Sequence, residues 1–212
     1  MKDSIHTYVE SLIKERSPLF QEMEHYAQEN GVPIMELAGI EVLLQLISMQ
    51  KPCKILEIGT AIGYSAMRMA DALTDVQIVT IERDDERYEQ AIKNIKQSQY
   101  GNKINVLKGD ALEIVEEVKK FGPFDAIFID AAKGQYMKFF ELYTPFLTKD
   151  GYVYTDNVLF KGLVAEENIE NKRIRNLVGK IKKYNEWLVN HEDYLTTIIP
   201  VGDGLAVSRK TK

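Results

Sequence analysis

The sequence contains few of the residues that cross-link small domains or bind zinc. Among its 212 residues there is one cysteine, Cys53, and there are three histidines, His6, His25 and His191. A single cysteine excludes an intrachain disulfide and any site with several thiolates, which favours a reducing compartment. No two histidines stand at metal-ligand spacing, so we do not expect a zinc hydrolase.

Long apolar runs and an excess of positive charge are also missing. The apolar stretches are strand-sized, far below the roughly 20 residues of a membrane-spanning helix, and the first residues are too polar for a signal peptide. The net charge of −5 argues against a protein that coats nucleic acid with its whole surface, but a local basic patch is compatible with it. We therefore expect a cytoplasmic protein with no membrane partner, in which residues 1–212 form a single domain.

The N-terminal part, residues 1–50, has helical periodicity throughout. Apolar residues recur at helical spacing before Ser17-Pro18, again up to Asn30-Gly31, and a third time from about residue 36 to residue 49. We interpret most of these apolar stripes as core packing. The first stripe consists of Ile5, Tyr8, Val9, Leu12 and Ile13.

From residue 54 onward, strand-like runs alternate with amphipathic helical runs. The expected strands are 54–58, 77–81, 103–107, 124–129, 152–155, 195–199 and 205–208, and the expected helices are 64–72, 85–98, 112–121 and 135–147. This alternation predicts parallel pairing with right-handed crossovers, whereas the glycine-rich turn before residue 205 predicts an antiparallel hairpin. The fold class is therefore α/β, with a seven-stranded, mostly parallel, doubly wound sheet and a C-terminal hairpin.

The first expected strand runs into a glycine loop with the pattern Glu57-x-Gly59-x-x-x-Gly63. Glycines there permit a tight turn and close approach of a ligand. A dinucleotide fingerprint would require glycine where Ala61 and Tyr64 stand, which disfavours an NAD-dependent oxidoreductase. A carboxylate at the strand end suits a cationic ligand, although a helix-capping loop with incidental glycines is an alternative.

Acidic residues also follow the next two expected strands. Glu82 stands where an acidic side chain typically binds the two hydroxyls of an adenosine ribose. Asp110 is placed to hold an adenine amino group. The alternatives are a solvated carboxylate beside Arg83 and a helix cap, respectively. Because ligands of open α/β sheets bind outside the carboxyl ends of the strands, the successive signals reinforce one another.

Oxygen ligands follow the fourth and fifth expected strands. Asp130 ends one strand, and Asp156-Asn157 ends the other. Two carboxylates and an amide suit Mg²⁺ or another hard divalent cation, and Lys133 could project over the same site as a base or charge stabiliser. Each aspartate alone is often only a turn former. The complete set nevertheless disfavours a cofactor-binding module without catalysis.

Together, these residues resemble the metal-dependent class I S-adenosylmethionine O-methyltransferases, the group that includes the catechol and caffeoyl-CoA enzymes. The resemblance spans about residues 34–208 and rests on Glu57-Ile58-Gly59, Glu82, Asp110, Asp130-Ala131-Ala132-Lys133 and Asp156-Asn157. It implies a Rossmann-like methyltransferase fold in which residues 1–50 cover the cofactor site and residues 51–212 form the core. It also implies a homodimer.

The same resemblance implies roles for individual residues. Asp130, Asp156 and Asn157 would bind the metal, Lys133 would assist deprotonation of the substrate, and Asp130 would share in catalysis. The implied contacts to S-adenosylmethionine are Met35, Glu57, Gly59, Gly63, Ser65, Glu82, Asp110, Ala111 and Asp130.

Three segments, residues 130–136, 155–162 and 200–205, more narrowly resemble the bacterial tRNA 5-hydroxyuridine methyltransferases, which form 5-methoxyuridine at the wobble position. Catechols offer adjacent hydroxyls, and 5-hydroxyuridine offers O5 and O4. A chelated divalent ion would orient either pair and lower the hydroxyl pKa. The leading interpretation is therefore a tRNA acceptor, and the alternative is a catechol-like or caffeoyl-CoA-like small molecule.

A tRNA anticodon loop would need local positive charge on the protein. Lys161 follows the expected metal ligands, and a basic strip lies further along the chain. The strip consists of Lys172, Arg173, Arg175, Lys180, Lys182 and Lys183. Phosphate contacts there would let an extruded base reach the metal, whereas a charged helix is more commonly just a solvated face.

Overall fold

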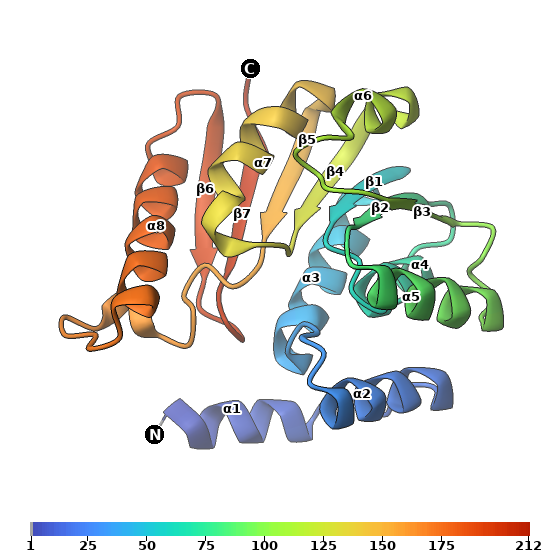
Figure 1. Ribbon diagram of the computed structural model, residues 1–212, viewed down its shortest axis with the longest axis horizontal. Coiled ribbons are helices and arrows are strands. Elements are labelled where there is room, and N and C mark those ends of the chain that lie inside the picture. Colours follow the sequence, from blue (N-terminus) through green and yellow to red (C-terminus); the bar gives the residue numbers. More distant parts are fainter. Residues whose placement is uncertain (1) are drawn as a thin grey trace.

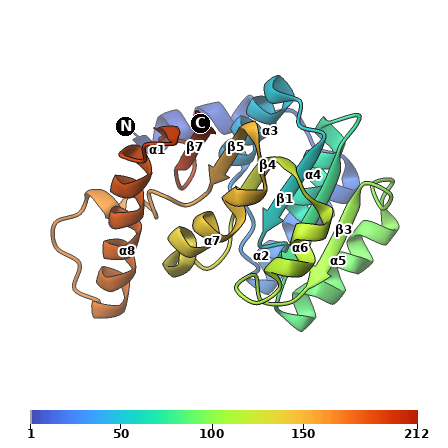
Figure 2. The same cartoon turned by 90° about the horizontal axis from the view of Figure 1, so that it is seen from above.

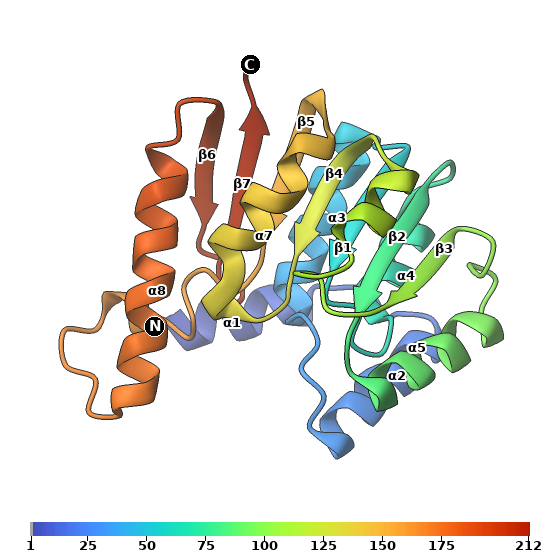
Figure 3. The same ribbon diagram turned by 45° about the horizontal axis from the view of Figure 1, so that its top comes forward.

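A seven-stranded sheet forms the centre of the molecule, which we describe from a computed structural model that covers residues 2–212, without the side chains of residues 2, 3 and 6. The strands are β1 (Lys54–Ile58), β2 (Gln77–Glu82), β3 (Ile104–Lys108), β4 (Phe124–Ile129), β5 (Leu147–Thr155), β6 (Tyr194–Ile199) and β7 (Leu205–Lys210). Their order is β3-β2-β1-β4-β5-β7-β6 (Figure 3). The first five are parallel, and β7 pairs antiparallel with both β5 and β6, so the predicted topology is confirmed.

Helices cover both faces of this sheet (Figures 1 and 2). The α-helices are α1 (Lys2–Ser11), α2 (Pro18–Asn30), α3 (Leu37–Gln50), α4 (Tyr64–Ala72), α5 (Asp85–Gln97), α6 (Val115–Val118), α7 (Tyr136–Tyr143) and α8 (Lys172–Val189). Short 3₁₀ turns η1 (Lys119–Phe121), η2 (Lys133–Gln135), η3 (Thr144–Phe146) and η4 (Leu163–Ala165) connect some of them. Within the described residues, no helix is long and apolar enough to cross a membrane.

Alternation along the strands builds two apolar cores. In β1, Ile55 packs into the core shared with α2–α5, whereas the next residue, Leu56, packs into the core shared with α6–α8. Successive side chains of a strand point to opposite faces, so a strand that is buried on both sides needs a continuous apolar run. This arrangement is the doubly wound architecture predicted from the sequence.

Helices α2 and α3 are tied to α4 by a polar network as well as by apolar packing. Arg68 of α4 is buried, donates to the Tyr64 hydroxyl over 2.7 Å and pairs with Glu41 of α3. The Tyr64 hydroxyl in turn donates to Glu24 of α2 over 2.6 Å. A buried guanidinium is tolerable only when such partners satisfy it, so this network fixes how the N-terminal helices sit on the core.

Several expected elements differ in length from those observed; the expected helix 135–147, for example, is shortened to α7, followed by η3 and the start of β5. The expected helix 112–121 is reduced to α6 and η1, because the chain makes a turn at Asp110 first, with the amide N–H groups of Glu113 and Ile114 bonded to the Asp110 carbonyl. Strand β5 begins at Leu147 instead of residue 152. The polar segment Lys149-Asp150-Gly151 looks like a turn in sequence, but it continues the strand through a register shift opposite β4.

The interpretation of the first apolar stripe as core packing is wrong. Ile5 and Tyr8 of α1, and Leu12 just after it, are each more than 60% exposed, Val9 is also exposed, and only Ile13 is partly buried. Helix α1 contacts α3 and extends along the edge of the molecule rather than over the sheet (Figure 1). Periodicity predicted the helix correctly, but it carries no information on whether a partner surface covers the apolar side.

Candidate active site

A cavity of about 680 Å³ opens at the carboxyl ends of the parallel strands. The loops after β1, β2, β3, β4 and β5 all contribute to its lining, as does the turn between β6 and β7. Pro33, Ile34 and Glu36, between α2 and α3, line it from the N-terminal side. Five strand ends meeting at one edge thus bring together side chains that are distant in sequence.

The glycine loop after β1 is required by close packing inside the protein. Gly59 has φ +105°, and a Cβ at this position would lie 2.2 Å from the backbone oxygen of Asp130. Gly63, with φ +85°, precedes α4. The first glycine therefore lets the loops after β1 and β4 approach each other, which places Asp130 against the cavity.

Glu57 and Ser65 lie beneath the cavity and do not line it. The Ser65 and Thr80 hydroxyls donate to the two oxygens of the Glu57 carboxylate, which is fully buried. Burial raises the pKa of Glu57 to about 8, although both hydroxyl bonds oppose the shift. Met35 is likewise buried, against Gly39 in the apolar core, although its neighbours Ile34 and Glu36 line the cavity.

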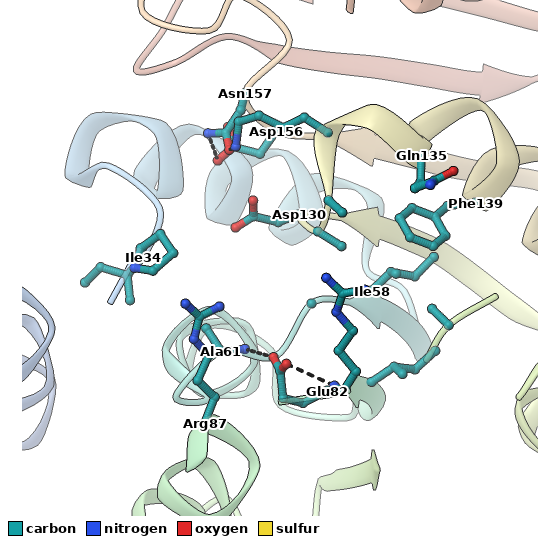
Figure 4. Close-up of a pocket in the computed structure, with 18 of the residues that line it drawn as sticks. Ile34, Ile58, Ala61, Glu82, Arg87, Asp130, Gln135, Phe139, Asp156 and Asn157 are labelled. Carbon is teal, nitrogen blue, oxygen red and sulfur yellow. Dashed lines mark hydrogen bonds between the residues drawn. The ribbon is translucent and has the colours of Figure 1, made fainter. Parts of the chain in front are cut away.

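Glu82 is buried at the end of β2 and lines the cavity. Its Oε1 accepts from the N–H groups of Arg83 and Asp84, both over 2.9 Å, and its Oε2 accepts from that of Ala61 over 2.8 Å (Figure 4). The alternative of a solvated carboxylate is therefore wrong. Since a carboxylate oxygen has about two lone-pair directions, Oε2 has room for one further donor.

Asp110 caps a turn rather than a helix, and it also lines the cavity. Its Oδ1 accepts from the Leu112 N–H over 2.9 Å, which is a local cap, and its Oδ2 lies 3.3 Å from Arg83 Nη1. Gly109, Asp110 and Ala111 all line the cavity. The cap therefore orients the carboxylate without removing it from the cavity wall.

Asp130, Asp156 and Asn157 converge on the other side of the cavity (Figure 4). Asn157 Nδ2 donates to Asp156 Oδ2 over 2.9 Å, and Lys133 Nζ donates to Asn157 Oδ1. Burial, followed by repulsion from Asp130, raises the pKa of Asp156 to about 8. Desolvation raises the pKa of Asp130 to about 6, against the opposing effect of Lys133. The raised pKa values mean that two neighbouring carboxylates are costly to ionise together in this pocket unless a cation is bound between them.

This donor set fits a hard divalent cation in its chemistry. Two carboxylates and one amide oxygen are the ligand types that Mg²⁺ prefers. No group of three or more His, Cys, Asp or Glu side chains in the described part of the chain is arranged to hold a metal. A cation would therefore depend on the amide of Asn157 and on water or substrate oxygens to complete its coordination.

Several lining residues were missed in the sequence. Arg87 extends from the first turn of α5 toward the cavity (Figure 4), while Phe160 and Asp203 lie on its other side, together with Lys161, which the sequence had already indicated as a source of positive charge. Asp203 could have been found, because a hairpin that follows a parallel strand returns its turn to the edge where the cavity lies. Arg87 carries no signal in the sequence.

The basic strip lies on α8 and borders the site without lining it. All of its side chains belong to exposed residues. Lys180 is the one that comes near the site, since its Nζ would lie 3.6 Å from a Cβ at Gly134, next to Lys133. Helix α8 packs on the 3₁₀ turn η2 that carries Lys133. The strip is therefore adjacent to the lysine side of the cavity.

The fold and the position of the cavity define a Rossmann-like methyltransferase. Residues 10–211 match the family model described as O-methyltransferase, and the chain belongs to this family. A Staphylococcus aureus structure described as a candidate caffeoyl-CoA O-methyltransferase is 38% identical, with a TM-score of 0.87 over 98% of this chain and 96% of that one.

Other relatives cover most of the chain at lower identity. Catechol O-methyltransferase of Niastella koreensis is 30% identical over 78% of this chain and 77% of its own, and flavonoid 3′,5′-methyltransferase of Vitis vinifera is 28% identical over 89% and 82%. The O-methyltransferase TomG of Streptomyces achromogenes, solved in complex with SAM, is 25% identical with a TM-score of 0.83 over 99% and 96%.

Proposed function

We propose that the protein methylates 5-hydroxyuridine at the tRNA wobble position, using S-adenosylmethionine and a divalent cation. The observation that carries the proposal is the convergence in one cavity of two chemically different groups of residues. The cofactor half consists of Gly59, Glu82 and Asp110. The acceptor half consists of Asp130, Lys133, Asp156 and Asn157.

The cofactor half suits the adenosine end of S-adenosylmethionine. Glu82 Oε2 is held by the Ala61 N–H and retains capacity for one ribose hydroxyl. Asp110 faces the cavity where an adenine amino group would donate to it. The SAM-bound relative TomG supports the same cofactor for this chain.

The acceptor half suits loss of a hydroxyl proton. When bound, S-adenosylmethionine supplies an activated methyl group, and a hard cation lowers the pKa of a hydroxyl that it contacts. The carboxylates of Asp130 and Asp156 would hold that cation, together with Asn157. Lys133 Nζ, which already contacts Asn157 Oδ1, is placed to assist removal of the proton.

The surroundings of the cavity support a nucleic-acid acceptor. Lys161 lines the cavity, and Lys180 of the basic strip lies beside Gly134 at its margin. In a chain with net charge −5, such positive charge at the margin provides the phosphate contacts that position a nucleic acid. An extruded base could then enter while the backbone stays on the surface.

A catechol-like or caffeoyl-CoA-like small molecule is the second candidate. It is favoured by the named activities of the relatives, which act on flavonoid, catechol and caffeoyl-CoA acceptors. The same chelation by two neighbouring oxygens would serve these acceptors. Two experiments distinguish the two candidates: an assay with different acceptors, and substitution of the basic strip.

The test is methyl transfer from labelled S-adenosylmethionine to three acceptors offered separately. They are tRNA that carries wobble 5-hydroxyuridine, a catechol and caffeoyl-CoA. We expect label in the wobble nucleoside of tRNA, found by nucleoside mass spectrometry, and at least tenfold lower kcat/KM with either small molecule. Transfer to a small molecule alone would replace the tRNA proposal with the second candidate.

Replacing Lys172, Arg173 and Arg175 together by alanine tests the partner. We expect a raised KM for tRNA and unchanged affinity for S-adenosylmethionine. The KM should also depend less steeply on salt, because a variant that contacts fewer phosphates releases fewer counterions when it binds tRNA. A matched control replaces Lys119, Lys120 and Lys149, which are exposed and do not line the cavity. Equal KM values and salt slopes for the two triple variants would leave the strip as a solvated helix face.

A further inference from the structure

The loop between Asn157 and Gly162 begins in the acceptor half and is hydrogen-bonded to the turn between β6 and β7. We propose that Asp203, in that turn, is a positioning residue that fixes this loop and thereby places Phe160 and Asn157 for the acceptor. Its effect on methyl transfer rests on the proposed function, whereas its effect on the loop does not.

The loop has an unfavourable backbone. Asn157, Phe160 and Lys161 have φ values of +60°, +44° and +56°, and Gly162 follows at +76°. Asparagine and glycine adopt the left-handed region with little strain, but phenylalanine and lysine do so rarely. Strained residues of this kind persist only when the surrounding structure holds them.

Three hydrogen bonds from the loop to the turn provide that support. The Val158 N–H donates to the Gly204 carbonyl over 3.1 Å, and the Leu159 N–H donates to the Asp203 carbonyl over 2.8 Å. The third bond runs from the Lys161 N–H to the Asp203 carboxylate Oδ1. It is the one bond of the three that involves a side chain, and it reaches the strained part of the loop.

Packing makes the loop and the turn complementary. Gly204 has φ +88°, and a Cβ there would lie 2.3 Å from Leu159 Cγ and 2.8 Å from its backbone nitrogen. Gly202 and Gly204 both have positive φ, whereas Asp203 does not, so its identity is not dictated by backbone conformation. The contact with the Lys161 N–H is therefore the feature of this turn that depends on the Asp203 side chain.

The loop carries two side chains that face Lys133. Asn157 accepts a hydrogen bond from Lys133 Nζ at one end of the loop, and the Phe160 ring centroid lies 5.9 Å from the same atom near the other end. Phe160, Lys161 and Asp203 all line the cavity. Fixing the backbone of Lys161 therefore also fixes the Phe160 ring beside Lys133. A planar acceptor ring would pack against Phe160 there.

Limited trypsin digestion tests the loop directly, because Lys161 is exposed and precedes Gly162. We expect Asp203→Ala to be cut after Lys161 at least tenfold faster than wild type. Asp203→Asn keeps an acceptor oxygen for the Lys161 N–H and should be cut within twofold of the wild-type rate. Asp150→Ala, in another Asp-Gly pair and exposed, is the matched control and should also be unchanged.

The kinetic arm uses tRNA that carries 5-hydroxyuridine. We expect Asp203→Ala to raise the KM for tRNA about tenfold with an unchanged Kd for S-adenosylmethionine, and Asp203→Asn to restore the KM. If no acceptor is methylated by wild type, the proposed function fails, and the digestion still decides the role of Asp203. Wild-type cleavage of Asp203→Ala, or equally fast cleavage of the Ala and Asn variants, would overturn the positioning role.

Discussion

The two halves of the cavity are held together by different means. In the cofactor half, each acidic group is satisfied by nearby backbone: Glu82 accepts three N–H groups and Asp110 accepts one. In the acceptor half, Asp130 and Asp156 repel each other and have raised pKa values. In the cofactor half, backbone N–H groups at the strand ends stabilise the carboxylates. In the acceptor half, the protein leaves the negative charge of the carboxylates largely uncompensated.

That difference predicts where function and stability separate. Groups satisfied by backbone contribute to the fold and to binding together, so their removal affects both. Carboxylates crowded in a pocket contribute to function at the expense of stability. Substitutions in the acceptor half should therefore abolish turnover without unfolding the protein.

The largest effect is expected for Asp156→Ala. Loss of one anionic cation ligand should lower kcat on the order of a thousandfold, which corresponds to several kcal/mol of transition-state stabilisation. The melting temperature should not fall, since the substitution removes a buried carboxyl group whose ionisation burial and Asp130 both oppose. Calorimetry should give an unchanged Kd for S-adenosylmethionine. If Asp156→Ala had the same kcat as wild type, the proposed difference in function between the two halves would be wrong.

Glu57, beneath the cofactor half, should make stability depend on pH. Burial raises the pKa of Glu57 to about 8 from its ordinary value of 4.5, so the folded state binds the proton more tightly than the unfolded state. The associated stability is present below about pH 4.5 and is lost as pH rises to about 8, up to roughly 5 kcal/mol. Relative to wild type, Glu57→Gln should become progressively more stable across this window in urea unfolding. Parallel curves for the two proteins would mean that Glu57 titrates normally.

An intermediate effect is expected for Glu82→Ala. Loss of hydrogen bonds to a charged group should weaken binding of S-adenosylmethionine by about 1.5–3 kcal/mol. Because Glu82 also accepts three backbone N–H groups, its removal should lower the melting temperature, unlike Asp156→Ala. Calorimetry and thermal unfolding measure the two effects. An unchanged Kd would restrict Glu82 to a structural role.

The smallest effect is expected for Arg83→Ala. The Arg83 side chain is 67% exposed where it pairs with Asp110 over 3.3 Å, and exposed ion pairs contribute at most about 1 kcal/mol. The Kd for S-adenosylmethionine should change less than fivefold, and the difference from wild type should shrink in high salt. A larger, salt-insensitive loss of affinity would show that Arg83 itself contacts the cofactor.

The predictability of the site follows the same division. Glu82, Asp110, Asp130 and Asp156 each lie at the end of a strand or within two residues after it, so the chain pattern locates them. The hairpin places Asp203 at the same edge, but the contact of Asp203 with Lys161 depends on the register of that antiparallel hairpin, which local sequence does not encode. The position of Arg87 in the cavity wall depends on tertiary packing in the same way.

The fold was predictable to a similar degree. Strand and helix order followed from the alternation of short, largely apolar strand-like runs with amphipathic helical runs. Burial of the α1 stripe was not predictable, since amphipathic spacing is the same whether or not another surface covers it. The early start of β5 was hidden by polar residues at 149 and 150, which lie on an exposed part of the strand.

The most direct test of the difference between the halves is a chelator titration of the wild-type protein. Methyl transfer to 5-hydroxyuridine tRNA and the Kd for S-adenosylmethionine are measured over the same range of EDTA, with Mg²⁺ added back as the control. We expect methyl transfer to fall at least a hundredfold and to recover with Mg²⁺, while the Kd changes less than twofold. Undiminished transfer in excess EDTA would contradict the cation role of Asp130, Asp156 and Asn157.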